Sequence, residues 1–426
     1  MLNRLTPPPT RPLGRVDLPT AQVSHLANGA RLHVLPHSAQ PVVRLQVVLP
    51  AGRWYDPAPG VSLLTARGLL EGTRTRSARQ IAEEVAFYGA SLDCEQGFDR
   101  ATLTLYCLAK HFDQLVQLVQ DVLLNATFPA AELEQIKTRT IQNIRVERQK
   151  TSYLASERFA HNLYGPQHPY GVVFDEQSFS TLQSEAVSQF YQRAYSLAQA
   201  EIFLCGAVTD EHVRHLSEVL SASTSANALP SRSIAPSAQA IPTDHVTVPE
   251  SIQASIRLGR LWPSPQQTET HQLQVLVKVL GGYFGSRLMK NIREDKGLTY
   301  GIYASVAQRE HASSCVIGSD VNAANAPIAI QEIHKELLRL QNELIPDDEL
   351  ETVRNYIQGK FLNELGTVFE QADKYRSTIL LGLPASFYTS FLSEVSNVSS
   401  VQLQTLAQHY LSPSDFCQVL AGPALS

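Results

Sequence analysis

The two halves of this 426-residue chain repeat one pattern of elements. In each half, a proline followed by alanine or acidic residues opens a long helical stretch, and these prolines, Pro129 and Pro346, stand 217 residues apart (346 − 129). Each half also ends in an amphipathic helix and a strand that closes on a glycine, Gly206 or Gly422, at an offset of 216 residues (422 − 206). A repeat of this length predicts two tandem, similarly folded α+β domains.

Composition supports a globular chain with more than one core. The chain has 43% hydrophobic and 18% charged residues, which is typical of a soluble globular protein, and 426 residues exceed the size of one typical domain. The net charge of −5 is too small to indicate nucleic-acid or membrane binding and no basic block stands out, so we expect neither kind of partner. No apolar run reaches the roughly 18 residues that a membrane span needs.

Domain boundaries follow from changes in composition. Residues 1–20 are predicted to be a Pro-rich N-terminal arm, and residues 21–220 the first domain. Residues 221–244 are rich in Ser, Ala and Pro without apolar periodicity, which is typical of a linker. Residues 245–426 are then the second domain.

The cysteines and the N-terminus indicate a reducing compartment. The five cysteines are odd in number and form no C-x-x-C pair, and most lie in apolar, strand-like runs, so buried free thiols are expected. The N-terminal arm lacks the apolar core of a secretory signal. We therefore expect the protein in the cytoplasm.

The stretch 281–303 is predicted to form a glycine-rich loop, a helix and the start of a strand. Arg293 lies near the end of this helix and Tyr300 on the strand just after it, so both can point into one cleft. A guanidinium and a phenol are both hydrogen-bond donors that could bind a carbonyl oxygen or stabilise an oxyanion. The alternative is an ordinary surface arginine beside a half-buried tyrosine.

Four stretches of this sequence resemble the M16 peptidase family, which includes insulinase, pitrilysin and the mitochondrial processing peptidase. These stretches are NGARLHVL (28–35), Gly72-Thr73, HPYG (168–171) and, most specifically, GSRLMKNIREDKGLTYGIYA (285–304). The resemblance extends over nearly the whole chain. It implies two similar α+β domains, each an antiparallel sheet with helices packed on it, which together form half of a clamshell chamber.

The same resemblance implies that the zinc site of the family is missing from this chain. Active family members carry His-x-x-Glu-His on the helix before the Gly-Thr, where two histidines bind zinc and the glutamate activates water. Placed by Gly72-Thr73, this motif falls on Leu63, Ala66 and Arg67, and the third ligand on Asn143. None of these side chains can bind zinc well or act as the general base, and neither H-x-x-E-H nor H-E-x-x-H occurs in the sequence. We therefore expect this chain to bind no metal cofactor.

The retained Arg293 and Tyr300 resemble the pair that reaches the zinc-bound substrate in M16 enzymes. In two-subunit members, one subunit keeps the zinc and the other keeps this pair. The resemblance therefore implies a non-catalytic subunit of a heterodimeric zinc peptidase, in which the partner carries His-x-x-Glu-His and the zinc and both chains act on peptides. Gly281, Gly282 and Gly285 would let the substrate backbone approach closely, or they would only serve the turn.

Two other hypotheses belong to different classes. The chain could be a structural or assembly protein that has inherited the fold, without a role in proteolysis; the retained Arg293 and Tyr300 count against this. It could also be a self-sufficient metalloenzyme that uses other ligands.

Overall fold

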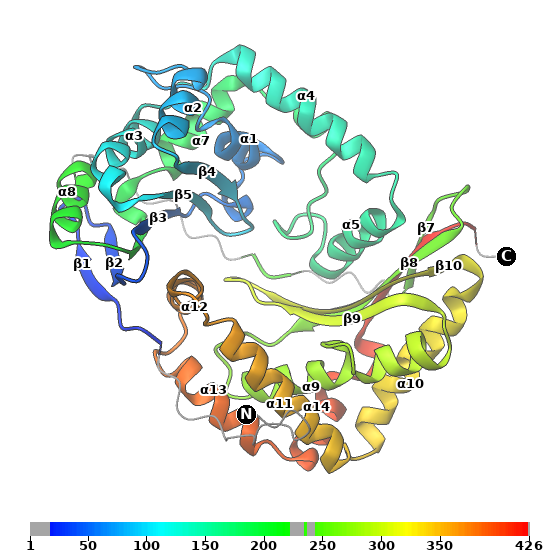
Figure 1. Cartoon of the computed structure of the whole chain (residues 1–426). Coiled ribbons are helices and arrows are strands. Elements are labelled where there is room, and N and C mark those ends of the chain that lie inside the picture. The colour runs from blue at the N-terminus through cyan, green and yellow to red at the C-terminus, as the bar shows by residue number, and fades with distance from the viewer. Residues whose placement is uncertain (1–17, 222–233, 237–242, 425–426) are drawn as a thin grey trace, which may run out of the picture.

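The computed structural model describes residues 18–221, 234–236 and 243–424. Most of the predicted arm (1–20) and of the predicted linker (221–244) lies outside the described residues. Figure 1 shows that the first half of the chain and the second half each form a sheet with helices packed on it.

A six-stranded sheet lies at the centre of the first half. Its strand order is β1-β2-β6-β3-β5-β4. The strands are β1 (Gln22–His25), β2 (Arg31–Pro36), β3 (Val42–Leu49), β4 (Ser91–Gln96), β5 (Ala101–Leu108) and β6 (Glu201–Gly206). All neighbouring pairs are antiparallel except β2 and β6, which are parallel.

The second half repeats this arrangement with five strands, in the order β7-β11-β8-β10-β9. They are β7 (Thr243–Thr247), β8 (Gln253–Trp262), β9 (Thr299–Ala307), β10 (Ser313–Asn322) and β11 (Cys417–Gly422). Again one pair, β7 and β11, is parallel and the others are antiparallel. The predicted fold class, two tandem similar α+β domains, is confirmed, and the antiparallel sheets differ from expectation only by this one parallel pair in each.

Each half contributes helices that pack on the sheets, and the two halves build separate cores. In the first half they are α1 (Val61–Gly68), α2 (Ala78–Phe87), α3 (Phe112–Asn125), α4 (Ala130–Glu147), α5 (Thr151–Tyr164), α6 (Glu176–Ser180), α7 (Ser184–Ala194) and α8 (Asp210–Ser221). In the second half they are α9 (Thr270–Gly281), α10 (Ala326–Asn342), α11 (Asp347–Asn363), α12 (Val368–Leu380), α13 (Phe387–Asn397) and α14 (Ser400–Tyr410). Each core is a continuous cluster of buried apolar side chains.

Each half packs one of its helices on the sheet of the other half. Helix α5 of the first half packs on β8 and β11 of the second, and α12 of the second half packs on β6 of the first. On β11, Leu420 belongs to the core of its own half, whereas its neighbours Val419 and Ala421 contact the cluster that contains α5. Because successive strand residues point to opposite faces, α5 covers the face that the second half's own helices leave open.

Buried polar contacts tie helix α12 to the first sheet. Arg44 on β3 is buried and donates 3.0 Å hydrogen bonds to the Asp373 carboxylate and the Phe369 carbonyl. The buried His33 ring lies 2.8 Å from the Tyr375 hydroxyl and 2.9 Å from the Glu201 carboxylate. These bonds satisfy polar groups that would be costly to bury alone, so they fix how the halves meet.

A second link, the inter-half cluster, consists of Trp54, Asp99, Arg100, Glu310 and His311. The turn between β9 and β10 carries Glu310 and His311 into the first half, where the His311 ring stacks on the buried Trp54 ring at 3.7 Å. Arg100 holds the Glu310 carboxylate with two hydrogen bonds of 2.7 and 2.8 Å, and Asp99 accepts one from the Glu310 backbone at 3.2 Å. The bidentate geometry makes this a directional contact between the halves.

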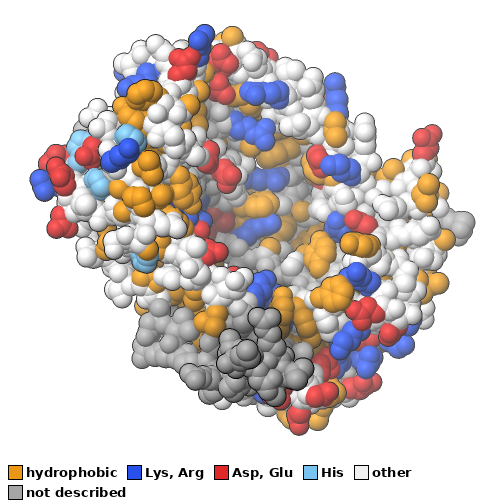
Figure 2. Space-filling model, viewed as in Figure 1, with side chains coloured by type: hydrophobic (Ala, Val, Ile, Leu, Met, Phe, Trp, Pro, Cys, Tyr) orange, Lys and Arg blue, Asp and Glu red, His pale blue; other side chains and the backbone are white. Residues whose placement is uncertain are grey.

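The two halves face each other around a central space, which α4 borders at the top of Figure 1. In the same view, Figure 2 shows that the molecular surface is hollowed there, with Lys, Arg and hydrophobic side chains on the walls of the hollow. Among the described residues, no helix combines the length and the apolar character that crossing a membrane requires.

The buried His168, which lies against Trp54 of the inter-half cluster, makes the stability of the folded chain depend on pH. It is buried against Trp54, and burial, together with the positive charges of protonated His311 and of Arg309, lowers its pKa to about 4. Between about pH 6.5 and pH 4 the unfolded chain therefore binds a proton that folded His168 does not. The contribution of His168 to the free energy of unfolding is therefore fully present above about pH 6.5 and is lost as the pH falls toward 4.

We expect His168→Gln to reduce the loss of stability at low pH. Melting temperatures measured between pH 4 and pH 8 test this. The lowered pKa of His311 acts in the same direction, so the loss is not abolished. His409→Gln, a change at an exposed histidine, is the matched control. A His168→Gln profile parallel to that of the unchanged chain would contradict this assignment.

Candidate functional site

The structure brings Arg293 and Tyr300 together. Arg293 lies on η4 (Met289–Asp295), a π-helical segment, and Tyr300 lies on β9. The Cζ atom of Arg293 is 5.2 Å from the centroid of the Tyr300 ring. Gly297 ends the helical segment with a left-handed φ of 62°, so the chain reverses here and places the strand beside the helix.

Both residues line one cleft of 660 Å³. Four aromatic side chains, Tyr283, Phe284, Tyr300 and Tyr303, lie around it. Among the described residues, no hydrogen bond or ion pair engages the Arg293 guanidinium or the Tyr300 hydroxyl, and the Tyr300 side chain is 90% exposed. Both donors therefore remain available for a ligand.

Three aromatic residues of this cleft, Tyr283, Phe284 and Tyr303, were not singled out from the sequence. Phe284 is 62% exposed, and its ring centroid lies 4.5 Å from the Cζ atom of Arg293. The signal for Phe284 was a pair of adjacent aromatic residues, Tyr283 and Phe284, within a run of glycines.

The three predicted glycines are placed differently. Gly281 and Gly282 line the cleft, whereas Gly285 does not. A Cβ on Gly281 would lie 2.7 Å from the backbone nitrogen of Ala304, so the end of α9 can approach β9 only with glycine there. This packing accounts for Gly281 without a ligand, and a substrate role for the glycines stays a prediction.

The cleft follows an open strand edge. β9 is the outermost strand of its sheet and pairs only with β10 among the described strands. Six consecutive residues of this strand, 300–305, line the cleft. The free edge of β9 can therefore pair with an extended segment of another chain.

The positions predicted from the zinc motif lie on two packed helices. Leu63, Ala66 and Arg67 are on α1 and Asn143 is on α4, and these helices contact each other. Arg67 Nη1 donates a 2.8 Å hydrogen bond to the hydroxyl of Thr140 on α4. Burial and the nearby charge of Arg139 lower the pKa of Arg67. A guanidinium now bridges the two helices and a second one is close by, which does not fit a metal cation.

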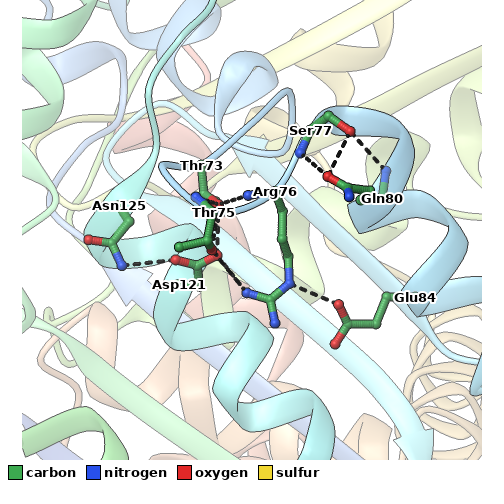
Figure 3. A network of polar contacts seen from close by, with 8 residues as sticks. All are labelled: Thr73, Thr75, Arg76, Ser77, Gln80, Glu84, Asp121 and Asn125. Carbon is green, nitrogen blue, oxygen red and sulfur yellow. Dashed lines mark hydrogen bonds and ion pairs between the residues drawn. The ribbon is translucent and has the colours of Figure 1, made fainter.

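The Gly72-Thr73 segment after α1 has a structural role, shown in Figure 3. The Asp121 carboxylate accepts hydrogen bonds from the Thr73 and Thr75 hydroxyls at 2.7 and 2.8 Å and from Arg76 at 2.8 Å. Burial alone would raise the pKa of Asp121, but these bonds and one from Asn125 hold it below its usual value. The network fixes the end of α1 to α3, so this motif can persist without a metal.

No group of three or more His, Cys, Asp or Glu side chains could hold a metal ion in the part of the chain that the structure describes. We expect that Leu63→His with Arg67→His creates neither stoichiometric zinc binding nor peptidase activity in the isolated chain. The third ligand and the general base would still be missing.

Metal analysis of the purified variant and a chelator-sensitive peptide assay check this prediction. The comparator is the variant that adds Ala66→Glu and Asn143→Glu, because it restores all four groups. Tightly held zinc with activity in the double variant would contradict the prediction.

Two family models match the chain. "Peptidase M16 inactive domain" matches residues 181–357, and "Insulinase (Peptidase family M16)" matches residues 33–167. The fold and the sequence define a two-domain chain of the metallopeptidase type that lacks the inverted zinc motif His-x-x-Glu-His. This chain belongs to the M16 peptidase family.

Relatives of this chain include proteins named both as peptidases and as non-peptidases. An uncharacterized zinc protease, YmxG of Bacillus subtilis, is 22% identical over 86% of this chain and 88% of its own length. A non-peptidase homolog, YmxG of Helicobacter pylori, is 20% identical over 84% of this chain and 83% of its own length.

Solved structures share the fold. A peptidase M16 inactive domain from Pseudomonas fluorescens superposes with a TM-score of 0.85 at 22% identity, covering 95% of this chain and 99% of that one. A protease from Helicobacter pylori superposes with a TM-score of 0.86 at 17% identity, covering 95% of this chain and all of that one.

Proposed function

We propose that this chain is the non-catalytic subunit of a heterodimeric, zinc-dependent M16-type peptidase. The observation that carries the proposal is a contrast between the two halves. The positions at which the family resemblance places the metal ligands carry Leu63, Ala66 and Arg67, whereas the second half presents Arg293 and Tyr300 in an open cleft, where no described residue engages their donor groups. A scaffold has no need of two such free donors, although packing could keep them.

In this proposal the partner is an M16 subunit that carries His-x-x-Glu-His, holds the zinc and supplies the general base. Arg293 donates a charge-assisted hydrogen bond to a carbonyl oxygen of the bound peptide. Tyr300 donates its hydroxyl proton in a hydrogen bond to the oxyanion that develops as the carbonyl is attacked. Neither residue needs to change its own ionisation for this role.

The substrates are peptides or unfolded segments. An extended peptide can pair with the free edge of β9, and its side chains then lie along the aromatic cleft. We take the cytoplasm as the compartment, which is supported by the five free cysteines.

Co-purification tests the assembly. The full chain is expressed with an M16 subunit from the same organism that carries His-x-x-Glu-His, and the mass of the purified species is measured. The proposal predicts a stable complex of both chains in equal amounts. A chain that stays alone, or that co-purifies with a membrane complex instead, would contradict it and favour a structural or assembly role.

A further inference from the structure

The Arg293 guanidinium lies against two aromatic rings from two different elements. Phe284, from the loop after α9, lies 4.5 Å from its Cζ atom, and Tyr300, from β9, lies 5.2 Å from it. Cations are attracted to the faces of aromatic rings at such distances. Arg293 therefore has two ring contacts but no carboxylate partner among the described residues.

Phe284 itself is not explained by the core. Its side chain is 62% exposed, and the apolar cluster of the second half does not include it. The neighbouring Tyr283 packs on Tyr356 of α11, with ring centroids 4.8 Å apart. Gly285 leaves room for this ring, because a Cβ there would lie 2.9 Å from Tyr283. The loop is thus anchored through Tyr283, and this leaves Phe284 in the cleft beside Arg293.

Ring contacts and carboxylate contacts affect an arginine differently. A carboxylate would occupy the N–H groups of the guanidinium and neutralise its charge. An aromatic ring restrains the guanidinium while leaving its five N–H donors and its charge available. A restrained arginine loses less side-chain entropy when it binds a ligand.

We propose that Phe284 is a positioning residue, which holds Arg293 in the orientation that binds the substrate carbonyl. This inference rests on the proposed function and extends it to a residue outside the Arg293–Tyr300 pair. In this account the glycine-rich loop serves to place Phe284 beside Arg293, and no glycine needs to contact the substrate.

The test is a double-mutant cycle on the assembled heterodimer. Phe284→Ala is expected to lower kcat/KM by about 3- to 30-fold, the range that corresponds to a cation–π contact. Phe284→Tyr keeps a ring and is expected to stay within about twofold of the unchanged enzyme. Phe284→Leu keeps much of the apolar volume but has no ring, so it should not rescue the loss.

The cycle is completed in the Arg293→Ala background, where Phe284→Ala should have almost no further effect. Phe87→Ala, which removes an 82% exposed phenylalanine of α2, is the control and should leave kcat/KM unchanged. The melting temperature and the heterodimer yield of each variant show whether the chain still folds and assembles.

The outcomes separate this inference from the proposed function. If Arg293→Ala slows the enzyme but Phe284→Ala does not, only the role of Phe284 is overturned. The same follows if Phe284→Leu behaves as the unchanged enzyme, or if Phe284→Ala is equally harmful without Arg293. If Arg293→Ala has no effect, the proposed function and this inference both fail.

Discussion

Tyr300→Phe is expected to lower kcat of the assembled heterodimer by about 100- to 1,000-fold, the usual effect of removing one oxyanion donor. Arg293→Ala is expected to lower kcat/KM by about 10- to 100-fold, because the bound peptide loses a charge-assisted hydrogen bond. No described residue engages either donor in the cleft and neither side chain is part of a core, so the loss should come from weaker binding of the substrate or the transition state rather than from folding. Initial rates on a quenched fluorescent peptide, measured at saturating and at low peptide concentration, give kcat and kcat/KM separately.

The control for the arginine is Arg79→Ala, because Arg79 on α2 lies outside the cleft, pairs with Glu83 at 2.7 Å and has a side chain that is 86% exposed. This variant should retain full activity. Gel filtration of each variant with the partner should give the unchanged heterodimer. Normal turnover of both Arg293→Ala and Tyr300→Phe would contradict the assigned roles.

Trp54→Ala is expected to lower the free energy of unfolding by about 3–5 kcal/mol, the range for removing a large buried aromatic side chain. Trp54 is 1% exposed and stacks on His311 of the other half at 3.7 Å. Its loss leaves a cavity in the inter-half cluster and removes the surface on which the β9–β10 turn rests. We therefore also expect the two halves to unfold less cooperatively.

Urea unfolding followed by circular dichroism measures this change. Ile252→Ala, at a side chain that is 78% exposed, is the control and should change stability by less than about 0.5 kcal/mol. A Trp54→Ala chain as stable as the control variant would show that the inter-half cluster contributes little to holding the halves together.

Local patterns explain what could be predicted from the sequence. The repeat predicted two similar domains because the same elements recur at nearly constant spacing. The proximity of Arg293 and Tyr300 was predictable because only a short turn, ended by Gly297, separates a helix from a strand. The absence of the short, contiguous His-x-x-Glu-His motif could also be read directly from the sequence.

Contacts between distant segments could not be predicted in this way. No local sequence signal indicates that α5 and α12 each pack on the sheet of the other half. An amphipathic pattern shows that a helix has an apolar face, but it does not show which element covers that face. The stacking of Trp54 on His311 joins residues from opposite halves. The parallel pairs β2–β6 and β7–β11 likewise bring together strands from the beginning and the end of each half.

The measurement that tests the central claim most directly is peptidase activity on a short quenched peptide with three preparations. These are this chain alone, its His-x-x-Glu-His partner alone, and the two mixed. A split active site predicts activity only in the mixture, abolished by a chelator and restored by zinc. Equal activity in the partner alone would contradict the account and return Arg293 and Tyr300 to a structural role.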